Sequence, residues 1–176
     1  MKPGKRSFLF SVQIACILAL TGLSVAWAEV IVLKRFALDD MKGVISRSGV
    51  EIDKKTPADG RWCLKIVADR PRVVRLFEVS DVSVDNARLI YQARVRTQDV
   101  TGMVFLEMWC HFPGKGQYFS RGLQTPLSGT TGWTTEETPF FLKKGEKPDL
   151  IKLNLVINGT GTAWIDDIRL LKAPLK

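Results

Sequence analysis

The chain has 176 residues, a formal net charge of +8 and 45% hydrophobic residues. A length in this range predicts one domain, because typical domains run to about 100–200 residues. The basic residues are dispersed and form neither a basic stripe nor a recognised motif, which argues against a nucleic-acid-binding protein. The single histidine, His111, leaves little from which to build a Ser/His/Asp or Cys/His catalytic site.

Residues 1–28 have the three parts of a secretory signal peptide in the right order. Basic residues lie among the first six positions, an apolar run follows over residues 8–23, and Ala26-Trp27-Ala28 has small residues where a signal peptidase cuts. Polar residues interrupt the apolar run, whereas a membrane-spanning helix needs about 20 apolar residues. We therefore expect cleavage after Ala28 rather than a retained membrane anchor.

The mature chain, residues 29–176, would then have 148 residues and work in the periplasm or outside the cell. Three basic residues leave with the signal peptide, so 23 Lys and Arg remain against 18 Asp and Glu, a net charge of +5. A chain of this length can bury a core without disulfides or metals. The two remaining cysteines cannot form a disulfide-rich scaffold, and their spacing matches no zinc site.

Alternation of apolar and polar residues at every second position dominates the mature chain and predicts half-buried β-strands. The alternation is clearest over residues 89–96, 105–112 and 151–158. Turn-forming residues separate the runs, and no ten-residue stretch has the pattern of an amphipathic helix. About nine short strands predict an all-β sandwich, in which one sheet often curves and has a concave outer face. The shorter candidate strands are 30–36, 44–48, 62–67, 73–79, 118–121, 134–142 and 162–171.

Four segments add a more specific signal. Residues 164–170 read Trp-Ile-Asp-Asp-Ile-Arg-Leu after a Gly-Thr-Gly turn, and residues 59–66 read Asp-Gly-Arg-Trp-Cys-Leu-Lys-Ile. Residues 36–40 carry a phenylalanine followed by acids, and Gly132-Trp133 precedes a late strand. Together these segments resemble jelly-roll carbohydrate-binding modules of the cellulose/xylan-binding, galactose-binding-like group. The resemblance implies a jelly-roll β-sandwich of two antiparallel sheets over residues 29–176.

The resemblance also implies a structural calcium ion between the last strand and the N-terminal strand. Alternation places every second residue of a strand on the same side, and this parity puts Asp166 with Trp164 against the core. A carboxylate is costly there unless something pairs with it. Asp39, Asp40 and Asp59 could supply further oxygen ligands for calcium. Alternatively, Asp166 accepts backbone amides or pairs with an arginine at the rim of the sandwich, and no other cofactor is required.

The polar face of the middle strands is the candidate ligand surface. Sugars are held by aromatic platforms under their C–H faces and by planar polar groups on their hydroxyls. Trp109 could be such a platform, because it lies between the polar residues Glu107 and His111. The competing interpretation is an ordinary solvated face on which one tryptophan packs against long side chains. The candidate ligand-binding residues are Gln92, Arg94, Glu107, Trp109, His111, Tyr118, Arg121 and Asn154.

An enzymatic role is not expected from this face. Glu107 and His111 are four residues apart in a strand, so about 13 Å separates them. Glycoside hydrolysis needs two carboxyl groups about 5–9.5 Å apart, and the face offers one.

The leading hypothesis is therefore an exported, non-catalytic module whose partner is an oligosaccharide or polysaccharide. The alternative is a periplasmic protein-interaction or envelope-assembly module on the same fold, with a protein partner and no sugar ligand. The small number of exposed aromatic residues favours the alternative. Neither hypothesis involves nucleic acid or a stable membrane anchor after cleavage.

Parity also predicts two unpaired thiols. Cys110 alternates in phase with Met108 and should point into the core, whereas Cys63 opposes Leu64 and should point outward. A disulfide needs Cα atoms within about 7 Å, which opposite faces do not allow unless a bulge reverses one strand. We further expect Trp62, Trp133 and Trp164 to be core residues.

Overall fold

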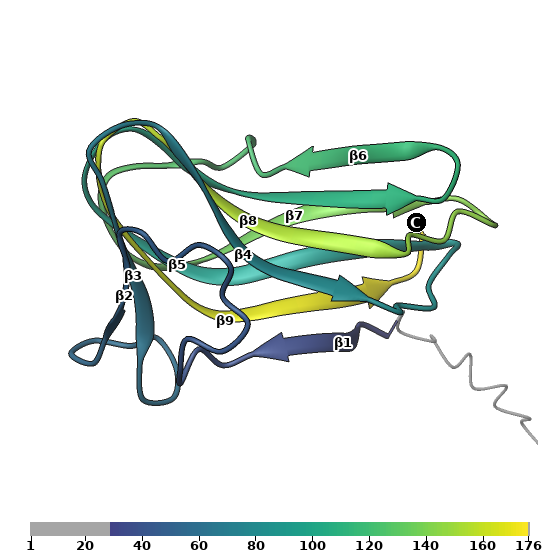
Figure 1. Cartoon of the computed structure of the whole chain (residues 1–176), viewed down its shortest axis with the longest axis horizontal. Coiled ribbons are helices and arrows are strands. Elements are labelled where there is room, and N and C mark those ends of the chain that lie inside the picture. The colour runs from purple at the N-terminus through teal and green to yellow at the C-terminus, as the bar shows by residue number, and fades with distance from the viewer. Residues whose placement is uncertain (1–28, 176) are drawn as a thin grey trace, which may run out of the picture.

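A computed structural model describes residues 29–175, which form nine β-strands and no helix (Figure 1). The predicted signal peptide, its cleavage site and Lys176 lie outside the described residues. Within residues 29–175, no helix is long and apolar enough to cross a membrane. The strands are β1 (Ile31–Phe36), β2 (Val50–Asp53), β3 (Cys63–Ala68), β4 (Arg72–Ser80), β5 (Ala87–Phe112), β6 (Gly116–Arg121), β7 (Leu127–Leu142), β8 (Leu150–Asn158) and β9 (Gly161–Ala173).

The long strand β5 bends and belongs to both layers of an antiparallel sandwich. Its first half pairs with β7 and β9, and β9 pairs in turn with β1 and β3, while β2 follows at the edge beside β3. We call this the first layer. The second half of β5 pairs with β6 and β8, and β8 pairs with β4, which completes the second layer. Figure 1 shows the layers meeting at the bend and running away from it side by side.

The bend in β5 depends on a glycine. A Cβ added to Gly102 would lie 1.9 Å from the carbonyl oxygen of Asn158, so the two chains approach more closely than any side chain permits. Thr101 N donates to Thr160 O at 3.0 Å beside it, which ties the bend to the turn between β8 and β9. Because the chain changes direction here, residues before and after the bend face the outsides of different layers.

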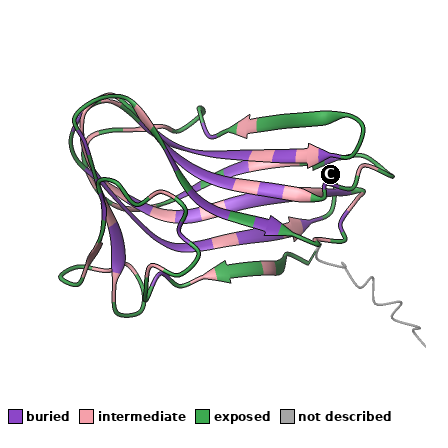
Figure 2. Ribbon diagram, in the orientation of Figure 1, coloured by how far each residue is buried: buried purple, intermediate pink, exposed green. Residues whose placement is uncertain are grey.

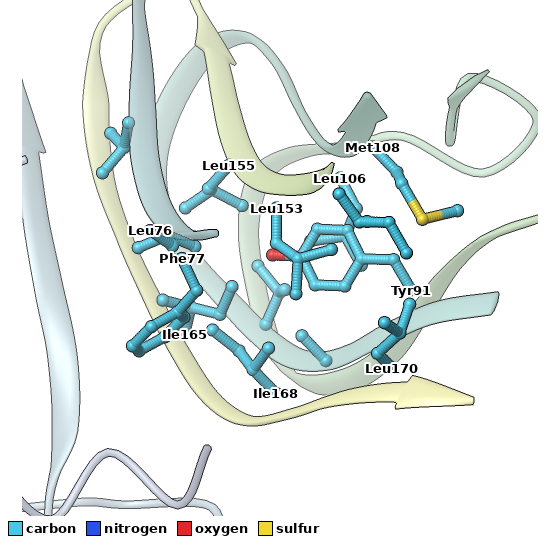
Figure 3. Packing of buried hydrophobic residues seen from close by; sticks show 14 of the residues in the cluster. Leu76, Phe77, Tyr91, Leu106, Met108, Leu153, Leu155, Ile165, Ile168 and Leu170 are labelled. Carbon is cyan, nitrogen blue, oxygen red and sulfur yellow. The ribbon is translucent and has the colours of Figure 1, made fainter. Parts of the chain in front are cut away.

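The hydrophobic core lies between the two layers. Figure 2 shows buried positions concentrated along the inner strands, and Figure 3 shows aliphatic side chains packed around Tyr91. Tyr91 in the first layer and Met108 in the second are both fully buried in this cluster. The predicted inward sides of residues 89–96, 105–112 and 151–158 are confirmed, and burying them supplies the main driving force for folding.

Four predicted strands differ in the structure. Residues 89–96 and 105–112 belong to one strand, β5, rather than two. Residues 44–48 form no strand, because positive-φ Gly43 and Gly49 bracket them, and they make only isolated hydrogen bonds to β4. β7 begins at Leu127 rather than 134, because its first half follows β5 around the bend.

Trp164 and Asp166 are buried as predicted, at 6% and 0% exposed, but their predicted orientation toward the core between the layers is wrong. Asp167 adopts a positive φ of 43° and the register between β5 and β9 shifts here, which is the mark of a β-bulge. Ile165 and Ile168 therefore both join the core cluster, whereas Trp164 opposes Arg96 of β5 on the outer side of the first layer.

None of the three tryptophans expected in the core belongs to the main hydrophobic cluster. The Arg96 guanidinium lies 4.0 Å from the Trp164 ring centroid and 5.5 Å from that of Trp133. The Trp62 ring packs under Lys54 at 4.8 Å. The Trp164 and Trp133 rings lie on the outside of the first layer, where the Arg96 cation can contact their faces.

Candidate functional site

The outer face of the second layer brings most of the candidate ligand residues together. Alternation in the second half of β5 turns Leu106, Met108 and Cys110 inward, so the intervening side chains face outward. The antiparallel register places outward residues of β6 and β8 beside them. The resulting Trp109 face consists of Phe105, Glu107, Trp109 and His111 of β5, Gln117, Phe119 and Arg121 of β6, and Lys152, Asn154 and Val156 of β8.

Glu107 is the hydrogen-bonding centre of the Trp109 face, and only 3% of it is exposed. Its carboxylate accepts from Trp109 Nε1 at 2.7 Å, Arg121 Nε at 2.7 Å and Asn154 Nδ2 at 3.1 Å. Burial alone would raise the pKa of Glu107, but these hydrogen bonds and the Arg121 charge hold it below its usual range. The carboxylate therefore stays ionised and fixes three neighbouring side chains.

Trp109 is half-buried and forms an aromatic pair with Phe119. The two ring centroids are 5.0 Å apart with planes tilted by 47°. The Phe119 ring is exposed, and the Arg121 guanidinium lies 4.5 Å from its centroid. The arrangement combines flat apolar surface with a cation at its border.

Polar side chains continue the face toward the end of β5. His111 Nδ1 is hydrogen-bonded to Asp149 Oδ1, and this contact lowers the pKa of the Asp149 carboxyl. Lys152 Nζ donates to Gln117 Oε1 at 3.2 Å across β5. These amide, imidazole and ammonium groups are suited to hydrogen bonding with hydroxyl groups.

A hollow of about 360 Å³ lies at the other end of the Trp109 face, near the bend. Its lining includes the apolar side chains of Val73, Phe105 and Val156, with Arg121 and Asn158 at its border. From Phe105 to His111 the face extends for about 20 Å along β5 at roughly 3.3 Å per residue. This length and shape suit an extended ligand.

Two predicted ligand residues lie elsewhere, which corrects the predicted surface. Gln92 and Arg94 are on the outer face of the first layer, because β5 bends between them and Trp109. Gln92 donates to Glu137 Oε1 and Arg94 donates to the Trp133 carbonyl at 3.2 Å. The arginine that pairs with the Glu107 carboxylate is instead Arg121 of β6, which was also a predicted ligand-binding residue.

Tyr118 also lies away from the Trp109 face. It alternates with Phe119 along β6 and so points to the other side of the strand. Its ring makes an edge contact with Phe112, with centroids 5.9 Å apart. The sequence pattern predicted Tyr118 on the face and did not predict Phe119, because the orientation of residues 118–121 depends on their pairing with β5.

The four aspartates proposed for calcium do not form one site. Residues 29–175 contain no group of three or more His, Cys, Asp or Glu side chains that could hold a metal ion. Asp39 accepts from Arg61 N, Asp40 accepts from Lys42 N, and Asp59 pairs with Arg35. These residues therefore do not fit a calcium ion.

Asp166 follows the alternative interpretation and accepts backbone amides. Its Oδ2 accepts from Ala58 N at 2.8 Å and Asp59 N at 2.9 Å, and its Oδ1 accepts from Asp167 N at 2.7 Å. Burial raises the pKa of Asp166 although these amides oppose the shift. The carboxylate fastens the loop before β3 to the outside of β9.

No protein-family model and no curated protein matches the chain, but solved structures do. The CBM22-1 xylan-binding domain from Paenibacillus barcinonensis Xyn10C has a TM-score of 0.60 at 11% identity, and the match covers 86% of this chain and 100% of that one. The C-terminal family 22 carbohydrate-binding module of Clostridium thermocellum Xyn10B has a TM-score of 0.53 at 11% identity, with 79% and 92% covered.

A family 16 carbohydrate-binding module has a TM-score of 0.50 at 14% identity, and the match covers 76% of this chain and 91% of that one. Identities this low concern the fold alone. The chain therefore has the jelly-roll β-sandwich fold of carbohydrate-binding modules, as the sequence motifs predicted.

Proposed function

We propose that this protein is a non-catalytic module that binds an oligosaccharide or polysaccharide on the Trp109 face. The observation that carries the proposal is the tilted pair of Trp109 and Phe119, set among hydrogen-bonding side chains on an outer sheet face. Aromatic rings accept the C–H face of a sugar, and amides and charged groups bind its hydroxyls. The shared fold with xylan-binding modules supports the same ligand class.

The site is held in place before any ligand arrives. Glu107 holds the Trp109 indole, the Arg121 guanidinium and the Asn154 amide by three hydrogen bonds. Lys152 and Gln117 are hydrogen-bonded to each other. Side chains that are already ordered lose less conformational entropy on binding, which favours affinity for a flexible glycan.

Binding without hydrolysis is the role that Glu107 supports. A general acid needs a raised pKa and access to the glycosidic oxygen. Burial raises the pKa of Glu107, but hydrogen bonds from three side chains outweigh burial and hold the pKa low. Glu107 therefore acts as a positioning residue for Trp109.

We propose further that the protein is exported to the periplasm or the cell exterior after cleavage of residues 1–28. The Ala26-Trp27-Ala28 sequence and the apolar run before it support this location. N-terminal sequencing of the exported protein should begin at Glu29. A mature chain that still contains Cys16 would contradict the proposal.

A glycan array probed with residues 29–176 tests the ligand class, and calorimetric titration of the strongest hit measures its affinity. Trp109→Ala should abolish binding and preserve the fold, because the ring lies outside the core. Trp62→Ala is the matched control, because Trp62 is also half-buried but lies outside the Trp109 face, packed under Lys54.

Two results would contradict the proposed site. The first is a folded Trp109→Ala variant that binds the hit as tightly as the wild type does. The second is an array without hits, which would favour the protein-interaction alternative on the same fold.

A further inference from the structure

A second hollow, of about 320 Å³, lies away from the Trp109 face, at the end of the sandwich opposite the bend. Its lining includes residues of the turn that joins β5 to β6 and of the turn that joins β7 to β8. Both turns are at the right of Figure 1. None of its lining residues belongs to the Trp109 face. Its lining consists of Phe112, Lys115, Tyr118, Phe140, Phe141 and Glu146.

Aromatic rings form the floor and rim of this hollow. Phe112 is 6% exposed and contacts Tyr118 and Phe140 at centroid distances of 5.9 and 6.1 Å. Tyr118 is 52% exposed and Phe141 57% exposed, so two large rings remain in contact with water. Exposed apolar surface gathered around a concave site is a mark of ligand binding.

One cation and one anion border the same hollow. Lys115 is on the β5–β6 turn, in which Gly114 and Gly116 both adopt positive φ angles. Glu146 is on the opposite turn, where its Oε2 accepts from Lys143 N at 2.8 Å. Because the two lining charges cancel, the hollow favours neither an anion nor a cation as its ligand.

We propose that this hollow, the Tyr118 pocket, binds one neutral sugar ring as a second subsite. Its volume is in the range of small-molecule sites, and its rings can cover the C–H faces of a sugar. Lys115 can donate a hydrogen bond to a sugar hydroxyl, and Glu146 can accept one. The proposal takes its ligand class from the proposed function but uses none of the residues of the Trp109 face.

The two sites lie on opposite sides of β6. Tyr118 and Phe119 are adjacent on this edge strand and almost equally exposed, at 52% and 51%, but they serve different sites. A polysaccharide that reaches both sites gains affinity, because the second binding event becomes intramolecular. The polymer should therefore bind more tightly than short fragments that fill one site.

Amide chemical shifts of the ¹⁵N-labelled protein test the Tyr118 pocket by titration with four probes. Methyl β-xylopyranoside and methyl β-glucopyranoside are the neutral probes, methyl β-glucuronide is the anionic control and tetramethylammonium is the cationic control. A neutral glycoside should shift the amides of Lys115, Tyr118, Phe141 and Glu146 more than either charged probe does.

Tyr118→Ala should abolish these shifts, whereas Phe119→Ala should leave them unchanged. Both side chains are exposed on an edge strand, so both variants are expected to fold. If Tyr118→Ala nevertheless unfolds, Phe141→Ala gives the same test from β7, because Phe141 is also exposed.

The inference is overturned if no neutral glycoside shifts the pocket amides at its solubility limit, if the shifts survive Tyr118→Ala or Phe141→Ala, or if tetramethylammonium alone produces them. Trp109→Ala separates this inference from the proposed function. If that variant binds oligosaccharide normally while the pocket shifts are present, the Trp109 face fails as a site and the Tyr118 pocket stands.

Discussion

The indole N–H of Trp109 donates to the carboxylate of Glu107 at 2.7 Å, two residues earlier on the same side of β5. Successive outward side chains of a strand rarely hold each other so directly, because they stand roughly perpendicular to the sheet. Here the bond fixes the direction of the indole plane. The orientation of the proposed binding platform thus depends on a buried carboxylate.

Glu107→Gln should weaken both the fold and sugar binding. The amide preserves the shape of the side chain but removes the charge that pairs with Arg121 and places an N–H group among donors. We expect the free energy of unfolding at pH 7 to fall by about 1–3 kcal/mol. Urea unfolding measures the change, and an unchanged midpoint would contradict it.

The stability difference between wild type and Glu107→Gln should also depend on pH. The folded pKa of Glu107 is below its ordinary value of about 4.3, so the unfolded chain takes up the proton first as the pH falls. The difference should be constant above about pH 5 and shrink as the pH falls through the folded pKa. A difference that grows with acidity would show the opposite shift.

Gly102→Ala should destabilise the protein by about 3 kcal/mol, the upper end of the usual cost of overpacking. The new Cβ would lie 1.9 Å from the Asn158 carbonyl oxygen, and backbone must move to accommodate it. Gly132→Ala is the matched control, because a Cβ there has no neighbour within 4 Å. Thermal unfolding of both variants is the measurement, and equal melting temperatures would disprove close approach at the bend.

Asp166→Ala should lower the free energy of unfolding by about 1–3 kcal/mol, because three backbone amides lose their acceptor. Asp40→Ala, which removes only an exposed bond to Lys42 N, should cost less than about 0.5 kcal/mol. The melting temperature of the wild type should be the same with added calcium chloride as with EDTA. A clear rise of the melting temperature with calcium would contradict this prediction and support a metal site.

Cys63 and Cys110 should react with thiol reagents only after unfolding. Both are unpaired, as the alternation predicted, and both are fully buried. Burial, with nearby carboxylates in the case of Cys63, raises the pKa of each thiol to about 12, so neither forms a thiolate at pH 8. Ellman titration of residues 29–176 without reductant should count no thiol in buffer and two in denaturant, whereas zero in denaturant would reveal a disulfide.

In the strands with the clearest alternation, the side that faces the core follows from the sequence. Period-two alternation over residues 89–96, 105–112 and 151–158 predicted the buried sides correctly, because a strand turns successive side chains to opposite faces. The same alternation separated Cys63 from Cys110 and turned Glu107, Trp109 and His111 to a common outer face. These are local properties, and each needs only a few consecutive residues.

Which strands lie side by side was decided by the tertiary structure. The alternation before and after Gly102 is the same, yet the bend there assigns Arg94 to one layer and Trp109 to the other. The bulge at Asp167 likewise reverses parity in β9, where an unbroken pattern predicted Trp164 and Asp166 inside. Both events arise from backbone contacts between residues that are distant in the sequence. No local pattern of side chains records such contacts, so the sequence indicated the face of a residue where its strand alternates without a bulge, but not its neighbours.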